Sequence, residues 1–217
     1  MNLKFSAPVR ESEAKMIKNI VFDFGNVLIK YNPEYMVSKY IQDSEDKKLM
    51  ESVVFDRLYW DRLDDGGITD EEVVAYSCAR LPERLHDLCR RIYYDWPLNL
   101  PAMPGMWELA ERVKKEYGVR LFLLSNIGSY FEKFEKHFSV LSLMDKRIYS
   151  ALVGHVKPNR DMFEYLLDTC NIIPNETLFV DDSQKNIDGA EAIGIHGYLF
   201  DGDSKKLSDY IDSLFDE

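Results

Sequence analysis

Polar side chains that could handle a phosphate stand directly after apolar, strand-like runs of this chain. Asp23 and Ser125 each follow such a run, Asp182 closes a third, and Lys157 precedes a proline upstream of it. In an open parallel sheet, residues just past the carboxyl ends of the strands gather in one crevice where ligands bind. The pattern therefore predicts a single site that contains carboxylates, a hydroxyl group and an ammonium group.

These residue types match the needs of phosphoryl transfer. A carboxylate such as Asp23 can attack phosphorus and divide one difficult displacement into two easier ones. Carboxylate and phosphate repel each other, so we expect a Mg²⁺ ion between them, since Mg²⁺ prefers a few hard oxygen ligands. Asp23, Asp182 and the backbone carbonyl of Gly25 are the expected metal ligands. Lys157 is a compact cation that can neutralise both the attacking group and a phosphate oxygen.

The remaining phosphate oxygens need hydrogen-bond donors. Ser125 and Asn126 are the candidates, and we expect both to bind substrate. Phosphoryl transfer depends mainly on positioning and on charge stabilisation, so this small set of groups could suffice.

The order of these motifs resembles the haloacid dehalogenase (HAD) superfamily of phosphohydrolases. The resemblance covers the chain from about Met16 to its C-terminus, and implies that Asp23 is the nucleophile and Lys157 the motif lysine. It also implies phosphate binding by Ser125 and metal binding by Asp182, whereas Asn186 stands where the family often has a supporting acid. The first motif, Asp-x-Gly-Asn-Val, is similar to that of bacterial glucose-1-phosphatase-like members. The implied activity is a phosphatase for a small phosphomonoester, such as a sugar phosphate, with an aspartyl-phosphate intermediate.

One position departs from the usual family pattern. Most phosphatases of this family have a second Asp two residues after the nucleophile, which protonates the leaving oxygen, and this chain has Gly25 there. General acids contribute roughly 10²–10⁴-fold to rate. A bound water, a residue of the cap or a good leaving group would have to replace this acid.

Other activities remain open at this point. A 2-haloacid dehalogenase would tolerate Gly25 but needs no metal, and the pair Asp181-Asp182 is an odd neighbour for an anionic substrate. A phosphomutase would need the proton transfers that Gly25 cannot make. A phosphate-binding protein without turnover would not need the nucleophile Asp23. Asp-Phe-Gly also occurs in protein kinases, but no His-Arg-Asp or Gly-rich phosphate loop precedes it here.

The predicted elements form an α/β protein with a Rossmann-like parallel sheet. Strands are expected at 18–22, 119–124, 147–151, 177–181 and 196–200, with helical patterns between them. Residues 16–30 and 101–217 would form this core domain. Residues 31–100 lack strand signals and are predicted to be an inserted helical cap of the C1 type. Helix starts are expected at Asn32-Pro33 and at the capping box that begins with Thr69.

Within the predicted cap, most aromatic residues should form the core of the cap itself, and Tyr59-Trp60 is the pair expected to face the site.

Residues 1–15 are polar, lack periodicity and are expected to be a flexible leader. His155 lies close to Lys157 in sequence and is expected to be an ordinary loop histidine. Cys170 completes an apolar helical face, which indicates a packing role.

The composition of the chain limits the classes of partner and the cellular compartment that we expect for the protein. The 217 residues carry a net charge of −11, which argues against a nucleic-acid partner because phosphate backbones are bound by clustered Lys and Arg. No apolar run approaches the roughly 18 residues of a membrane span. The three cysteines show no metal-binding spacing. We expect a cytoplasmic enzyme that acts on a small phosphorylated metabolite, and no motif indicates an oligomeric state.

Overall fold

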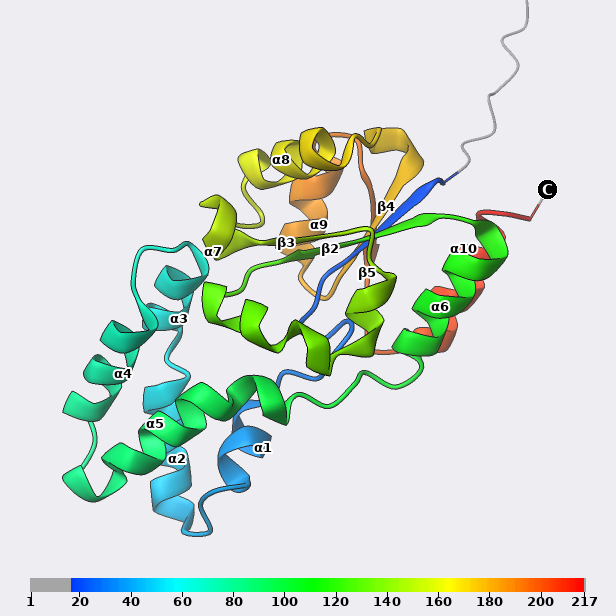
Figure 1. Ribbon diagram of the computed structural model, residues 1–217. Helices are drawn as coiled ribbons and strands as arrows, with labels where there is room; N and C mark the ends of the chain where they lie inside the picture. Colours follow the sequence, from blue (N-terminus) through cyan, green and yellow to red (C-terminus); the bar gives the residue numbers. More distant parts are fainter. Residues whose placement is uncertain (1–16, 217) are drawn as a thin grey trace, which may run out of the picture.

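The computed structural model describes residues 17–216, and at its centre is a five-stranded parallel sheet (Figure 1). The strand order is β3-β2-β1-β4-β5, so β1 lies in the middle between β2 and β4. This confirms the predicted α/β fold with a parallel sheet. The strands are β1 (Asn19–Phe22), β2 (Arg120–Ser125), β3 (Lys146–Tyr149), β4 (Thr177–Asp181) and β5 (His196–Leu199).

The sheet is buried on both faces because its central strands are apolar at almost every position. Successive side chains of a strand point to opposite faces, and in β1 Val21 joins one apolar cluster while Ile20 and Phe22 join the other. Strands covered on both faces read as continuous apolar runs rather than alternating ones. This is why the strand-like runs were visible in the sequence.

Helices cover the two faces of the sheet (Figure 1). On one face, Phe163 of α8 and Ile187 of α9 pack with Val21. On the other, Leu109 of α6 and Ile211 of α10 belong to the larger cluster that contains Phe22. These helices are α6 (Met106–Tyr117), α8 (Arg160–Cys170), α9 (Gln184–Glu191) and α10 (Ser204–Ser213). Shorter segments complete the core: η3 (Ser129–His137), η4 (Ser139–Leu143), α7 (Ser150–Val153) and η5 (Pro174–Glu176).

The elements between β1 and α6 are all helices, and they lie past the carboxyl ends of the strands (Figure 1). The side chain of Asn32 accepts a hydrogen bond from Tyr35 N at the start of α1, and Thr69 with Glu72 forms a capping box at the start of α4. Both helix starts are therefore where the sequence predicted them. The helices are α1 (Pro33–Ser38), α2 (Ser44–Val54), α3 (Arg57–Asp64), α4 (Asp70–Ala79), η1 (Glu83–Leu85), α5 (His86–Asp95) and η2 (Trp96–Asn99).

We keep the term cap for residues 31–100, as a proposed division of the chain. The apolar cluster on one face of the sheet continues without a break into the cap, through residues such as Val53 and Tyr93. The packing of the cap on the core therefore fixes its helices near the carboxyl edge of the sheet.

Two predicted features differ in detail from the structure. The strand predicted at 147–151 ends at Tyr149, because residues 150–153 form the short helix α7. Lys157 consequently does not stand at the end of a strand but in the connection between α7 and α8. The predicted leader, residues 1–15, lies outside the described residues.

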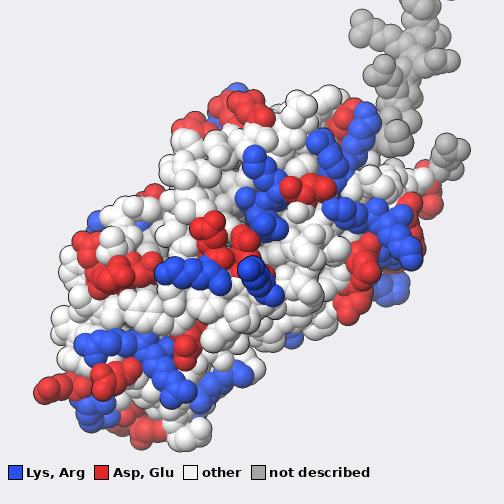
Figure 2. All heavy atoms as spheres, in the orientation of Figure 1, with Lys and Arg blue, Asp and Glu red and all other residues white. Residues whose placement is uncertain are grey.

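Acidic and basic side chains mingle over most of the face shown in Figure 2. The predicted absence of a nucleic-acid partner stays a prediction. Among residues 17–216, no helix has both the length and the apolar character needed to cross a bilayer.

Candidate active site

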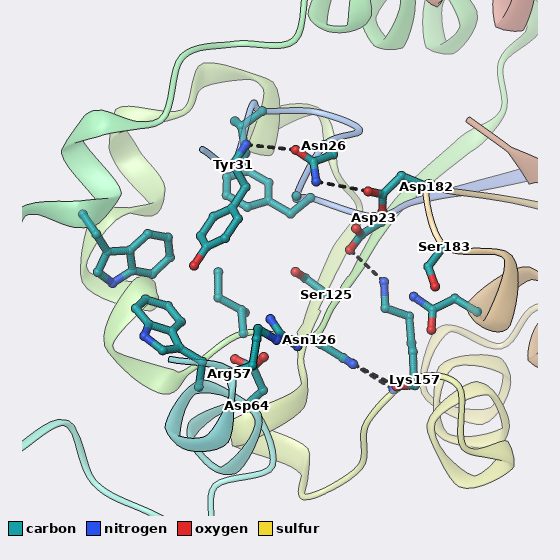
Figure 3. Close-up of a pocket in the computed structure, with 17 residues that line it drawn as sticks. Asp23, Asn26, Tyr31, Arg57, Asp64, Ser125, Asn126, Lys157, Asp182 and Ser183 are labelled. Carbon is teal, nitrogen blue, oxygen red and sulfur yellow. Dashed lines mark hydrogen bonds and ion pairs between the residues drawn. The ribbon is translucent and has the colours of Figure 1, made fainter. Parts of the chain in front are cut away.

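A cavity of ≈ 330 Å³ lies where the carboxyl ends of the central strands meet the cap (Figure 3). This volume is at the lower end of the range of small-molecule sites, roughly 300–1,000 Å³. The predicted site residues Asp23, Gly25, Ser125, Asn126, Lys157 and Asp182 all line it. The strand ends, together with the connection between α7 and α8 that carries Lys157, therefore bring these residues to one cavity.

Asp23 follows the last residue of β1 and is held there by the sheet. Its backbone N–H donates to Val180 O at 2.9 Å, which extends the pairing of β1 with β4, and only 8% of the residue is exposed. The next residues turn sharply, and Asn26 adopts a positive φ of 54°. The Asn26 side chain donates to Asp182 at 3.1 Å and accepts from Tyr31 N at 3.1 Å. It thus joins the loop after β1 to the loop after β4.

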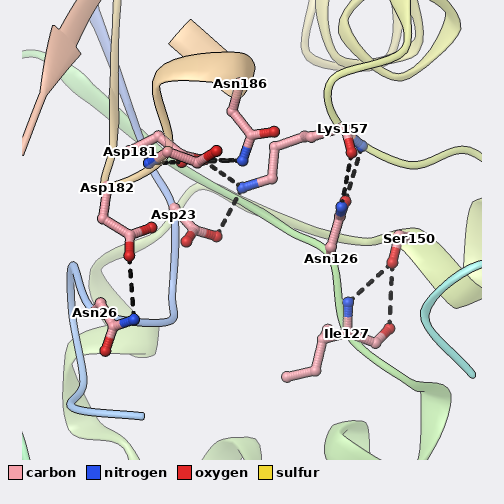
Figure 4. Close-up of polar contacts among 10 residues, drawn as sticks. Asp23, Asn26, Asn126, Ile127, Ser150, Lys157, Asp181, Asp182 and Asn186 are labelled. Atoms are coloured by element: carbon pink, nitrogen blue, oxygen red, sulfur yellow. Dashed lines mark hydrogen bonds and ion pairs between the residues drawn. The ribbon is translucent and has the colours of Figure 1, made fainter. Parts of the chain in front are cut away.

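The buried ammonium group of Lys157 lies between two carboxylates (Figure 4). Its Nζ atom is 2.7 Å from Asp23 Oδ1 and 2.7 Å from Asp181 Oδ2. Burial alone lowers the pKa of Lys157, but the two carboxylates raise it above its usual value, so the ammonium form persists. Burial raises the pKa of Asp23 to about 7, against the lowering effect of Lys157, and the charge of Asp181 adds to the rise.

Asp181 is completely buried, and side-chain and backbone donors surround its carboxylate. Besides Lys157, it accepts hydrogen bonds from Ser183 N at 2.8 Å and from Asn186 Nδ2 at 2.9 and 3.0 Å. Asn186, which stands where relatives often have an acid, therefore serves as a donor to Asp181. These donors hold the Asp181 carboxyl group in one position, and Asp181 in turn fixes the position of the lysine.

Ser125, the last residue of β2, and Asn126, which follows it, lie on the floor of the cavity, but their side chains have different surroundings. Ser125 is buried and lines the cavity. The Asn126 amide donates to Lys157 O at 2.9 Å and accepts from Lys157 N at 2.8 Å (Figure 4). Both polar atoms of this side chain are therefore engaged by the backbone of the lysine. The substrate-binding role of Asn126 stays a prediction, and in the structure its side chain holds the connection that carries Lys157 in place.

The acidic residues at this edge suit a divalent cation. Asp23, Asp181 and Asp182 each offer a carboxylate oxygen, and the three oxygens lie within 4.8 Å of one another. All are hard oxygen donors, as Mg²⁺ requires. Asp181 is the least suitable of the three, because its oxygens already accept from Lys157, Ser183 and Asn186. Asp23 and Asp182 are therefore the carboxylates best placed to hold the ion.

Comparison with known proteins decides the family. The family model described as haloacid dehalogenase-like hydrolase matches residues 17–194. This chain belongs to that family.

The curated relatives of this HAD-like hydrolase include a D-ribitol-5-phosphate phosphatase of Bacteroides thetaiotaomicron. The two sequences are 30% identical over 197 residues, which covers 84% of this chain and 91% of the relative. Among solved structures, a predicted HAD-like family hydrolase of Porphyromonas gingivalis matches with a TM-score of 0.69 and 24% identity, over 93% of this chain and 100% of that one. A HAD family enzyme of Bacteroides thetaiotaomicron, in complex with magnesium and inorganic phosphate, matches with a TM-score of 0.65 and 21% identity, over 88% and 98%.

The cap of this HAD-like hydrolase supplies the opposite wall of the cavity (Figure 3). Trp60 lines the cavity and donates its indole N–H to Val54 O, so it presents apolar surface to the site. Tyr59, the other aromatic residue expected there, instead stacks on Tyr76. The expectation for the pair is therefore correct for Trp60 only. His155 does not line the cavity and packs near Tyr165, as expected of a loop histidine.

Lining residues of the HAD-like hydrolase that the sequence did not predict include Tyr31, Arg57, Asp64 and Trp96. None follows a predicted strand, and all four belong to residues 31–100, the cap, whose orientation on the core is set by tertiary packing. Tyr31 could have been suspected, because it stands a few residues after Asp23 on the same connection. Nothing local in the sequence distinguishes Asp64 from the neighbouring acidic residues of its helix.

Proposed function

We propose that this HAD-like hydrolase is a Mg²⁺-dependent phosphatase that hydrolyses a small phosphomonoester through an aspartyl-phosphate on Asp23. The observation that carries the proposal is the contact of 2.7 Å between Lys157 Nζ and Asp23 Oδ1 at the floor of a small cavity. A buried carboxylate that is held by a buried ammonium group through one of its oxygens is positioned for attack. The other residues of the cavity then determine which substrate Asp23 attacks.

Each of the other floor residues has a role in this chemistry. Ser125, which ends β2, donates to a phosphate oxygen. Lys157 neutralises charge that builds up on the transferring phosphoryl group, and Asn126 keeps the backbone of Lys157 in place. Asp23 and Asp182 would hold the metal ion together with the carbonyl of Gly25. When bound, Mg²⁺ offsets the repulsion between the Asp23 carboxylate and the phosphate dianion.

The dehalogenase alternative receives less support from the site. A haloacid is an anion, and Asp23, Asp181 and Asp182 together place three carboxylates against a single buried Lys157. Without a cation this arrangement repels an anionic substrate. A binding protein without turnover has no use for the contact between Lys157 and Asp23. The phosphatase proposal accounts for the three carboxylates and for Lys157 together.

We propose a sugar or polyol phosphate as the substrate class. The curated relative that is 30% identical to this chain is named for ribitol 5-phosphate. In this chain the apolar surfaces of Trp60 and Trp96, with Tyr31, face the cavity and suit the C–H groups of such a chain. The cytoplasm is the proposed compartment, since Cys78, Cys89 and Cys170 are all free thiols. A small metabolite is the proposed partner, with no nucleic acid.

A screen of phosphorylated metabolites with and without Mg²⁺ tests this function. We expect phosphate release from sugar or polyol phosphates in the presence of the ion only. Halide release from 2-chloropropionate should be measured in parallel. Halide release without phosphate release would overturn the proposal in favour of the dehalogenase, and binding of phosphate esters without turnover would favour the binding protein.

A further inference from the structure

Asp64 is a buried carboxyl group of the cap that faces the same cavity as Asp23 (Figure 3). It is the last residue of α3, and only 7% of it is exposed. Within residues 17–216 its carboxyl group has no hydrogen-bond or ion-pair partner, and the nearby Arg57 pairs with Asp61 instead. Among the described residues no fully buried side-chain oxygen lacks a partner, so the unpaired oxygens of Asp64 are open to the cavity. A mostly buried carboxyl group that is left free toward a ligand site requires an explanation.

The end of α3 is held firmly against the core. A Cβ atom added at Gly128 would lie 2.9 Å from Cγ and Cδ2 of Leu63, so the missing side chain allows this close approach. Gly66 comes equally close to α7, since its Cβ would lie 3.1 Å from Ala151 O. Gly128 follows closely after Ser125 on the chain. The position of Asp64 is therefore fixed relative to the floor of the site.

The surroundings of Asp64 favour its protonated form. Burial raises the pKa of Asp64 to about 7, with Arg57 and Lys157 lowering it and Asp61 and Asp65 raising it. A carboxylate at the C-terminal end of a helix is further disfavoured by the helix dipole. A general acid works best when its pKa lies near the working pH.

Tyr31, the other hydroxyl-bearing group on that side of the cavity, is a weaker acid. Burial raises its pKa above 10, and the charge of Asp64 raises it further. Tyr31 is therefore a poor source of the proton that the leaving oxygen needs. Gly25, which has no side chain, offers none.

We propose that Asp64 is the proton donor to the leaving group, in place of the acid that is missing at Gly25. This inference rests on the proposed phosphatase function. As Asp23 Oδ attacks phosphorus and the bond from phosphorus to the ester oxygen breaks, Asp64 transfers its proton to that oxygen, and the alcohol departs. Asp64 is then a carboxylate. It takes a proton from the water that attacks the aspartyl-phosphate, which releases phosphate and restores both carboxyl groups to their starting states.

The proposal is tested with Asp64→Asn and two esters of similar shape, p-nitrophenyl phosphate and benzyl phosphate. Nitrophenolate leaves without a proton, whereas the benzyl alkoxide needs one. We expect kcat for benzyl phosphate to fall roughly 10²–10⁴-fold and kcat for p-nitrophenyl phosphate to fall less than about threefold. Asp65→Asn is the matched control, because Asp65 is the next residue, is exposed and does not line the cavity. It should leave both rates unchanged.

Three results would overturn the proposal. Equal losses on both esters would make Asp64 a general contributor to binding or structure. A change confined to KM would make it a binding group for the alcohol portion. In the wild type, kcat for benzyl phosphate should decline as pH rises past about 7, and an identical decline in Asp64→Asn would place the titrating group elsewhere. If the wild type hydrolyses neither ester, the phosphatase function itself fails, and this proposal with it.

Discussion

The ammonium nitrogen of Lys157 lies 2.7 Å from a carboxylate oxygen of Asp181, a residue with no exposed surface. The lysine is thus anchored on its far side by a carboxylate that no substrate needs to displace. Removing one partner of a buried ion pair leaves an uncompensated charge and costs about 3–5 kcal/mol. Asp181 therefore positions the lysine although it does not line the cavity.

Asp181→Asn should lower both turnover and stability. The variant removes one of the two carboxylates that position Lys157, so we expect kcat to fall by at least about tenfold and the unfolding free energy by about 3 kcal/mol. Turnover of p-nitrophenyl phosphate and thermal unfolding measure the two effects. Asp201→Asn is the control, since it breaks an ion pair with Lys206 in which both side chains are at least half exposed. Such an exposed ion pair contributes little to stability. Equal effects of the two variants would contradict the anchoring role.

Removal of the divalent ion should abolish turnover, because the Asp23 carboxylate and a phosphate dianion repel each other. Excess EDTA should stop hydrolysis of p-nitrophenyl phosphate, and added Mg²⁺ should restore it. Asp182→Asn should raise the Mg²⁺ concentration needed for half-maximal activity by at least about tenfold. Full activity in EDTA would remove the metal from the account.

The sequence predicted the residues on the floor of this site, at the ends of the strands, better than the cap residues that form its walls. Asp23, Ser125 and Asp182 follow apolar runs that are long enough to identify as buried strands, and parallel strands bring such ends together. Lys157 was recognised from motif order alone, and the short helix α7 before it was not foreseen. The full burial of Asp181 depends on neighbours from several segments, which no local pattern reports.

The walls depend on how the cap packs on the core. The sequence indicates a helical insertion between the first and second strands, because its segments have helical periodicity and capping residues. It does not indicate which face of α3 meets the core. That choice depends on the fit of Leu63 against Gly128, two residues that lie far apart in the sequence. Asp64 and Trp96 enter the cavity only as a result of this packing.

Asp64→Asn should stabilise the fold at alkaline pH. The carboxyl pKa of Asp64 is about 7 in the folded protein and near 3.8 when it is unperturbed. The folded state therefore binds more protons between about pH 4 and pH 7, and this group makes the protein less stable as pH rises through that window. We expect the variant to match the wild type near pH 4.5 and to exceed it by up to about 3 kcal/mol at pH 8.

Thermal or urea unfolding at the two pH values measures this difference. Asp23 titrates in the same range but is present in both proteins, so its contribution cancels. Asp65→Asn should show no comparable gain, because that side chain is exposed. A destabilised Asp64→Asn at pH 8 would show that the carboxylate has a stabilising partner.

Gly25→Asp should restore turnover of benzyl phosphate to the Asp64→Asn variant. A Cβ atom at Gly25 would meet no heavy atom within 4 Å, so a side chain can be accommodated there. The new carboxyl group would stand two residues after Asp23, where most phosphatases of the family have their acid. We expect the double variant to exceed Asp64→Asn by at least about tenfold in kcat on this ester. No gain, in a double variant that still hydrolyses p-nitrophenyl phosphate, would show that Asp64→Asn lacks something other than a proton donor.

The central claim is that Asp23 is the nucleophile of a phosphatase, and turnover by Asp23→Asn tests it most directly. An amide cannot form the phosphoryl intermediate, so we expect kcat for p-nitrophenyl phosphate with Mg²⁺ to fall by at least about 10³-fold. The fold should survive, because the two side chains have similar size and Lys157 keeps its contact with Asp181. A folded Asp23→Asn protein with turnover within tenfold of the wild type would contradict the account.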